Sequence, residues 1–333
     1  MGISNFDIVS SPGGVIGPSM SMGGVGNIYY VADTTSDAYP YIKAKIGEAR
    51  NSDGSPMLCP HTATSTVVTT NGFKTAEAAC VNDRNDYIIA LPSSNNYYID
   101  EVLTLDKRAT HLVCPAAMTN RVGCTNLCRL QQIGAGLSII SITNGAIEVA
   151  GLYLKNISGY AHITVPTTGT YSAWALSIHN NYFVSRSSTT TLPMLDCNGD
   201  GASYSRIENN WFTEQVLSGA WTAGVVDIEG AAANVDVVGN YITIGNSGNA
   251  TYGIRNLSGK GMVADNYFSE TGTSTITSCV TIGATGAAIG NRASVATGHF
   301  SDASGTTGVS YTDNTDGITN GASSGNLGAQ LQT

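Results

Sequence analysis

The feature that most constrains the fold is a short motif, asparagine–aromatic–apolar, that returns every 25–30 residues. Four copies are complete; an earlier copy has Leu in place of Asn, and a later one reads Asn-Arg-Ala. The copies begin at Leu152, Asn181, Asn210, Asn240, Asn266 and Asn291. Such a repeat is typical of a solenoid, in which each copy forms one coil that contacts only its neighbours.

Three further columns agree with this register. The residue before each copy is Gly, Asn or Asp, which adopt left-handed backbone at low cost. These bend residues are Gly151, Asn180, Asn209, Gly239, Asp265 and Gly290. Three positions before each copy lie the apolar residues Val149, Ile178, Ile207, Val237, Val263 and Ala288. Two positions after each start lie Leu154, Phe183, Phe212, Ile242, Phe268 and Ala293. Each copy therefore predicts a strand, a left-handed bend and a second inward-pointing residue.

The period within each copy is near two, as in "NVDVVGNYITIG", which indicates strands rather than helices. A coil of this length has room for about three short strands. The predicted fold is therefore all-β: a right-handed parallel β-helix with coils roughly 4.8 Å apart. The Asn column, Asn181, Asn210, Asn240, Asn266 and Asn291, should form a ladder of amide hydrogen bonds beside bends such as Gly239.

The aromatic position of each motif should point outward, because side chains alternate along a strand. This column reads Tyr153, Tyr182, Trp211, Tyr241 and Tyr267. Five aromatics on one exterior face favour a binding stripe for a sugar or a protein, with Trp211 at its centre. The alternative is that the bend tucks each ring against the next coil.

Charge and cysteine content narrow the function classes. Charged residues make up only 12% of the 333 residues and the net charge is −9, so no basic stripe for a nucleic acid is present. The sequence contains no apolar run long enough to span a membrane and opens without a secretory signal pattern. Its seven cysteines are odd in number and widely spread, which predicts no disulfide framework. Cys124 and Cys128 form a lone C-x3-C, a weak metal signal.

The predicted organisation has four parts. Residues 1–26 form a Gly-rich N-terminal arm, and residues 27–84 form an entry region with a short capping helix at "TAEAAC". Residues 85–295 form the β-helix. Residues 296–333 form a polar C-terminal tail with few apolar side chains, which by itself should be flexible.

Several segments together resemble pectate-lyase-like β-helix structural proteins of tailed bacteriophages. They are "MGISNF", "GNIYYV", "TAEAAC", "DYIIALP" and the Asn-bend coils, and the resemblance covers most of residues 1–295. The stretch "TSDAYPYIKAKIGEARNSDG" departs from the usual Asp/Gly-rich loop followed by "PF". The resemblance implies a non-enzymatic virion protein, made in the host cytoplasm. It would be a head decoration, fibre or tail-associated β-helix that forms a homotrimer and contacts capsid or tail proteins.

A carboxylate census leaves an enzymatic alternative open. Alignment of the strands places Asp196 over Asp227, with Glu229 nearby, and two carboxylates one coil apart match the spacing of a retaining glycosidase. The alternatives are thus a tailspike-type polysaccharide depolymerase or a glycan-binding adhesin for cell-surface polysaccharide. The stretch "DCNGDG" begins like a calcium loop, but Ile207 stands where a bidentate Glu is needed. We expect no catalytic site, metal or cofactor.

Overall fold

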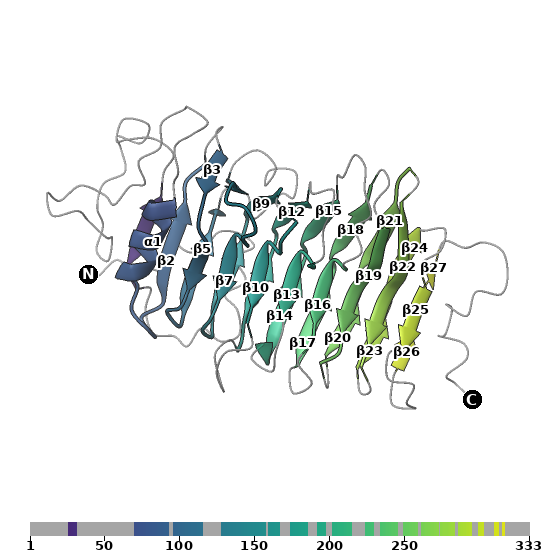
Figure 1. Ribbon diagram of the computed structural model, residues 1–333. Coiled ribbons are helices and arrows are strands. Elements are labelled where there is room, and N and C mark those ends of the chain that lie inside the picture. Colours follow the sequence, from purple (N-terminus) through teal and green to yellow (C-terminus); the bar gives the residue numbers. More distant parts are fainter. Residues whose placement is uncertain are drawn as a thin grey trace, which may run out of the picture.

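The chain folds into a parallel β-solenoid, seen in a computed structural model (Figure 1). The structure describes residues 26–31, 70–92, 96–115, 128–157, 159–166, 174–185, 192–197, 202–214, 224–229, 234–245, 249–258, 261–272, 274–283 and 286–294, and the backbone of 299–302, 310–312 and 315–316. Most of the predicted arm and residues 317–333 lie outside them. The parallel β-helix prediction is confirmed, whereas its right-handed sense stays a prediction.

Three sheets form the walls of the solenoid, and each coil adds one strand to each of them. Sheet 1 contains β1 (Ile28–Val31), β2 (Asp86–Ala90), β5 (Thr110–Val113), β8 (Glu148–Ala150), β11 (Ser177–His179), β14 (Ser205–Glu208), β17 (Val235–Val238), β20 (Met262–Ala264), β23 (Ala287–Ile289) and β26 (Ser310–Thr312). Sheet 2 contains β3 (Asn96–Ile99), β6 (Arg129–Gln132), β9 (Tyr153–Asn156), β12 (Tyr182–Ser185), β15 (Trp211–Glu214), β18 (Tyr241–Ile244), β21 (Tyr267–Glu270), β24 (Arg292–Ser294) and β27 (Thr315–Asp316).

Sheet 3 completes each coil before the chain returns to sheet 1. It contains β4 (Leu103–Leu105), β7 (Ile140–Ile142), β10 (Ile163–Val165), β13 (Leu195–Cys197), β16 (Val226–Ile228), β19 (Asn249–Asn256), β22 (Thr275–Ile282) and β25 (His299–Asp302). β25, β26 and β27 continue all three sheets beyond residue 295. An open strand edge explains this extension, because it offers unpaired backbone groups to any following segment.

The core runs the length of the solenoid and is made of the inward positions of the three sheets. Phe183, Phe212 and Phe268 are fully buried in sheet 2, and the rings of Phe183 and Phe212 stack with centroids 4.4 Å apart. The strands pair in the register that the motif spacing gives: Phe183 lies beside Phe212, and Ile242 beside Phe268. Constant register keeps like side chains in contact from coil to coil.

The motif asparagines lie in one buried column at the corner between sheets 1 and 2. The Nδ2 group of Asn181 donates to Oδ1 of Asn210 at 3.1 Å, and Asn210 donates in the same way to Asn240 at 3.0 Å. Asn240 and Asn266 continue the column to Asn291. Each amide also donates to a backbone carbonyl of the preceding coil, as Asn181 does to Val149 at 2.8 Å.

Left-handed backbone occurs at all three corners of the coil, and between sheets 2 and 3 it is found at Gly136, Gly159 and Gly272. The residues before the motif have positive φ, for example 65° at Gly239 and 55° at Asn209. A second column, which the sequence does not suggest, consists of Ala109, Ala146, Ala175 and Tyr204, with φ between 54° and 59°. These residues precede the strands of sheet 1, where alanine and tyrosine replace the Gly, Asn and Asp of the first corner.

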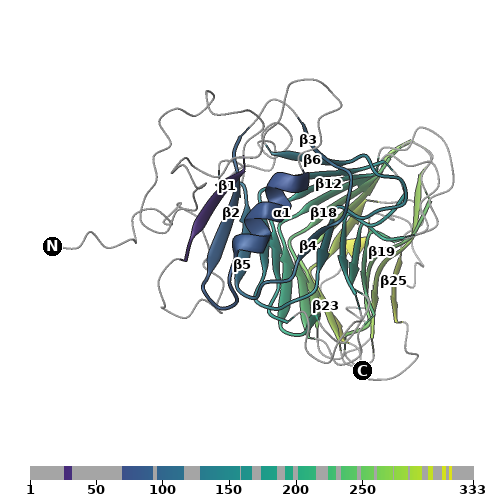
Figure 2. The ribbon, with the colours of Figure 1, turned by 60° about the vertical axis from the view of Figure 1, so that its left-hand side comes forward.

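One helix, α1 (Thr70–Ala79), covers the first coil. It packs against β1, β2, β3 and β4 and lies across the end of the solenoid in Figure 2. Phe73 is buried there with its ring 5.5 Å from that of Tyr97. A solenoid needs such a cover because its terminal coil would otherwise expose core side chains. The helix begins earlier than the "TAEAAC" segment that the sequence indicates.

A disulfide joins Cys114 and Cys128, whose Cα atoms are 6.3 Å apart. The sequence predicts no disulfide framework and does not reveal this single bridge. Cys114 directly follows β5 and Cys128 directly precedes β6, so the bridge joins the two sides of the corner between sheets 1 and 2 within one coil. Cys80, Cys197 and Cys279 are free and buried. Cys124 lies outside the described residues.

Candidate functional site on the outer face of sheet 3

One column of side chains on sheet 3 points away from the core. Its neighbours along each strand, such as Leu195 and Cys197 on β13, are buried inward, so the residue between them faces outward. Register places the following residues side by side: Thr104, Ser141, Thr164, Asp196, Asp227 and Arg255. The structure thus brings Asp196 and Asp227 together on adjacent strands, in the alignment that the sequence suggests.

Asp227 is held on both oxygens. Nε of Arg255 donates to Oδ1 at 2.7 Å, and Nη2 of Arg255 donates to Oδ2 at 2.5 Å. The hydroxyl of Tyr252 donates to the same Oδ2 at 2.6 Å, and the Arg255 guanidinium lies 4.7 Å from the Tyr252 ring centre. The hydrogen bond to Asp227 raises the pKa of Arg255 further. Arg255 also pairs with the exposed Glu229. A bidentate guanidinium with a phenol is a strong arrangement for holding a carboxylate.

Asp196 has no such support. Its side chain is 6% exposed, and its Oδ1 has no hydrogen-bond partner among the described residues. Burial raises its pKa to about 6, and the negative charges of Asp227 and Glu229 act in the same direction. A buried carboxyl group without donors favours its neutral form, since the charged form cannot recover its lost hydration.

These two carboxyl groups therefore differ in their chemistry: Asp196, with its raised pKa, exchanges a proton near pH 6, whereas Asp227 is ion-paired with Arg255. Such a difference between neighbouring carboxyl groups is the requirement for an acid and a base in one site. However, Asp227 is only 3% exposed and both of its oxygens are already engaged. Asp227 as it stands therefore offers a substrate no free oxygen for nucleophilic attack.

Metal binding finds no support in the described part of the chain. No group of three or more His, Cys, Asp or Glu side chains there is arranged to hold a metal ion. The "DCNGDG" stretch starts with Asp196 and Cys197 on β13, and its remaining residues lie outside the described ranges.

The aromatic column on sheet 2 lies on the outer face, as alternation predicts, and its rings contact one another. Centroids are 5.3 Å apart for Tyr153–Tyr182 and Tyr182–Trp211, and 4.9 Å apart for Trp211–Tyr241 and Tyr241–Tyr267. All five side chains are half-buried, and Nε1 of Trp211 is buried without a hydrogen-bond partner among the described residues. Tyr153 stacks on Tyr182 and Tyr241 on Tyr267, whereas the Trp211 ring is tilted against both of its neighbours.

Sheet 1 carries a polar cluster that the sequence does not reveal. Glu148 accepts hydrogen bonds from Nδ1 of His111 and Nε2 of His179, both at 2.7 Å. Burial by itself would raise the Glu148 pKa, but the two imidazoles lower it to about 2. Nε2 of His111 lies 2.7 Å from Oδ1 of Asn85, and the His111 ring stacks on Tyr87. His111 stands in a coil that lacks the motif, so spacing could not align it with Glu148.

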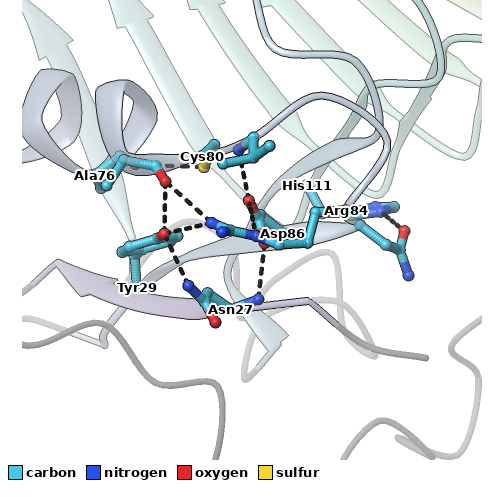
Figure 3. Close-up of polar contacts among 10 residues, drawn as sticks. Asn27, Tyr29, Ala76, Cys80, Arg84, Asp86 and His111 are labelled. Carbon is cyan, nitrogen blue, oxygen red and sulfur yellow. Dashed lines mark hydrogen bonds and ion pairs between the residues drawn. The ribbon is translucent and has the colours of Figure 1, made fainter.

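A second buried network fastens β1 to the cap (Figure 3). Asp86 is fully buried and accepts the backbone N–H groups of Asn27 and Val81, both at 2.7 Å, and Nε of Arg84 at 2.7 Å. Arg84 donates to the Tyr29 hydroxyl at 2.8 Å, and that hydroxyl donates to the carbonyl of Ala79. Because these groups are matched to donors and acceptors of the fold itself, this network is structural.

The described residues include no helix long and apolar enough to cross a membrane. Comparison of the chain with protein-family models, with curated proteins and with solved structures gives no match.

Proposed function

We propose that this chain is a non-enzymatic structural protein of a tailed-bacteriophage particle. Its solenoid is a stiff body that attaches to capsid or tail proteins and contacts the cell surface. The observation that carries the proposal is the continuity of the solenoid: ten parallel strands in sheet 1, nine in sheet 2 and eight in sheet 3. At about 4.8 Å per step, sheet 1 spans about 43 Å.

Stiffness follows from the contacts between coils. Each coil is bound to the next by three backbone ladders and by buried asparagine amides such as Asn181 and Asn210. Each coil of a solenoid contacts only its neighbours, so the length of the solenoid is set by the number of coils. Such a body suits a spacer or a fibre segment.

The state of the carboxylate pair favours a structural role over a depolymerase. A retaining glycosidase needs one carboxylate that can attack the sugar. Asp227, the ion-paired member of the pair, is covered and held by Arg255 and Tyr252. The resemblance of the entry segments and Asn-bend coils to phage β-helix proteins supports the virion as location and a homotrimer as assembly.

Labelling of particles tests the proposal. Antibodies raised against residues 85–295 should decorate virions of the phage that encodes the chain in electron micrographs. Deletion of residues 1–25 keeps Gly26 and the β1 network, so it should leave the melting temperature unchanged but abolish incorporation. Virions that carry no label would count against a location on the particle. Normal incorporation of the truncated chain would count against attachment through the arm.

The oligomeric state and the absence of catalysis need separate measurements. Sedimentation equilibrium should give a mass three times that of the 34.4 kDa chain. Incubation with bacterial surface polysaccharides should release no reducing ends. Release that disappears in an Asp196→Asn variant would instead support the depolymerase.

A further inference from the structure

The corner between sheets 1 and 2 has the same form in every coil that carries the motif. Two residues connect the strands there, as Gly151 and Leu152 do between β8 and β9. The first adopts left-handed backbone, with φ of 71° at Gly151, and the second lies in the column of the motif asparagines. The preceding coil differs, because β5 ends at Val113 and β6 begins only at Arg129.

The two disulfide cysteines occupy the two positions of this corner. The register between β5 and β8 places Cys114 one coil before Gly151. The register between β6 and β9 places Cys128 one coil before Leu152. The cysteines are 14 positions apart in the sequence, yet their Cα atoms are only 6.3 Å apart. The disulfide therefore joins two sides of a corner that a single peptide bond joins in the next coil.

This corner divides the chain into two parts. The entry unit, residues 26–114, contains α1 and the strands β1 to β5, and the shaft begins at Cys128, just before β6. Three backbone ladders hold the entry unit on the shaft: β5 pairs with β8, β3 with β6 and β4 with β7. Local opening of a protein follows such boundaries between contiguous units of chain. Opening of these three ladders would separate the capped entry unit from the shaft.

The disulfide opposes that separation. When the ladders open, a bridged chain gains less conformational freedom than a chain connected only through the residues between the cysteines. For a loop of about 15 residues, this entropy changes the opening equilibrium roughly a hundredfold. The reduced corner is still compatible with the fold, because the carbonyl of Ala90 lies 3.3 Å from Sγ of Cys128 and can accept a hydrogen bond from its thiol. Reduction therefore weakens the joint and leaves the coils intact.

Both sulfur atoms are shielded from solvent. Cys114 and Cys128 are fully buried, whereas thiol–disulfide exchange requires a thiolate to reach a sulfur atom. The bond can therefore form only while the corner is open, and once formed it is protected from reductants. The other described cysteines, Cys80, Cys197 and Cys279, are free and buried. Among the described residues, a change of redox conditions thus acts on one bond.

We propose that the Cys114–Cys128 bond is a redox-controlled staple, absent during synthesis, that locks the entry unit to the shaft in an oxidising environment. In this step the two thiols lose two protons and two electrons, and a sulfur–sulfur bond forms. A low-molecular-weight disulfide such as oxidised glutathione takes up the electrons and protons and is cleaved to two thiols. The timing rests on the proposed function, because a chain made in the host cytoplasm stays reduced until the particle is released.

Hydrogen exchange of the full chain, followed by mass spectrometry, tests the staple. A Cys124→Ser background excludes pairing with a third thiol. After incubation with dithiothreitol, the amides of β3, β4 and β5 should exchange up to about a hundredfold faster than after incubation with oxidised glutathione. The amides of β17 and β20 should exchange equally in both. The double variant Cys114→Ser, Cys128→Ser should match the reduced protein and ignore the reductant. Cys80→Ser, which removes a free thiol of the entry unit, is the matched control and should respond as the parent chain does.

The timing is measured in the producing cells. Acid quenching followed by alkylation with a maleimide labels every thiol that is free at that moment. Cys114 and Cys128 should carry the label in chain taken from the cytoplasm and should be linked in released particles. The same link should form when purified, reduced chain is incubated with oxidised glutathione.

The staple is overturned by equal exchange in the reduced and oxidised forms, or by faster exchange spread evenly over all coils. Loss of the folded state on reduction also overturns it, because the shaft should stay intact. A bridge already complete in acid-quenched cytoplasm overturns the timing. The exchange experiment needs no particle, so a chain that fails to label virions still shows whether the staple exists.

Discussion

Sheets 1 and 3 each place a nearly buried carboxyl group on the outer face of the solenoid, and the two groups behave in opposite ways. Glu148 on sheet 1 receives two imidazole hydrogen bonds, which lower its pKa to about 2. Asp196 on sheet 3 receives no hydrogen bond at Oδ1 from the described residues, and burial raises its pKa to about 6. Burial therefore does not decide the charge state by itself; the donors do. The satisfied group strengthens the fold, whereas the unsatisfied one weakens it.

The largest effect is expected at Glu148. Glu148→Gln removes the negative charge between His111 and His179 and should lower the unfolding free energy by about 3–5 kcal/mol at pH 7, the usual cost of breaking a buried pair. Urea denaturation followed by circular dichroism measures it. A variant as stable as wild type would show that the cluster contributes nothing, and the contrast between the sheets would disappear.

The loss of stability at low pH should reveal a second buried titratable group next to sheet 3, the imidazole of His162. His162 is fully buried, and burial lowers its pKa to about 4. The unfolded chain binds a proton on this histidine below about pH 6.5, so stability is full above that pH and falls by up to about 3 kcal/mol as the pH drops to about 4. His162→Gln should flatten this part of the stability profile. An unchanged slope across the same pH window would contradict the assignment.

The contribution of Asp196 to stability should change with pH in the opposite direction to that of His162. Its folded pKa is raised, so the folded state loses stability as the pH rises from about 4 to about 6 and carries the full cost above that range. Asp196→Asn should therefore stabilise the protein by about 1–3 kcal/mol at about pH 8 and leave it unchanged near pH 4. Denaturation midpoints of wild type and Asp196→Asn at the two pH values test this prediction. Destabilisation at the higher pH would place Asp196 with Glu148 as a structural carboxylate.

The smallest effect is expected at the corner that connects sheet 3 to sheet 1. Ala175 has φ of 54°, a conformation that glycine adopts more readily. Ala175→Gly should raise the unfolding free energy by about 0.5–1 kcal/mol, because relief of backbone strain exceeds the added freedom of the unfolded chain. Gly239→Ala at the other corner is the matched reverse change and should destabilise. Urea denaturation of both variants measures the effect. If both substitutions stabilised the protein, or both destabilised it, the shared left-handed geometry would be contradicted.

The sequence predicts most of the architecture, because the repeated motif marks one corner with residue types that have a distinct backbone preference. The bend at Gly239, the inward Phe212 and the alignment of Asp196 with Asp227 all follow from constant coil spacing. The second corner escapes prediction because alanine carries no left-handed signature. The contact between His111 and Glu148 escapes it because the coil that carries His111 lacks the motif.

The charge states escape prediction for a different reason. They depend on which donors reach each carboxyl group and on how much water is excluded, and neither is encoded in local sequence pattern. Asp196 and Asp227 are identical in type and lie in the same column, yet Arg255 and Tyr252 donate to Asp227. The C-terminal strands β25–β27 escape prediction because their segments contain few apolar residues.

The asparagine column has a direction. Each amide group donates forward, from Asn181 to Asn210 and onward to Asn291, while its own oxygen accepts from the coil before. A coil that has just emerged from the ribosome therefore holds an amide N–H whose acceptor lies 25–30 residues further along the chain. Every new coil completes the one before it and leaves one incomplete amide at the growing end. Vectorial synthesis and the hydrogen-bond order run the same way, so folding can advance coil by coil from the capped end.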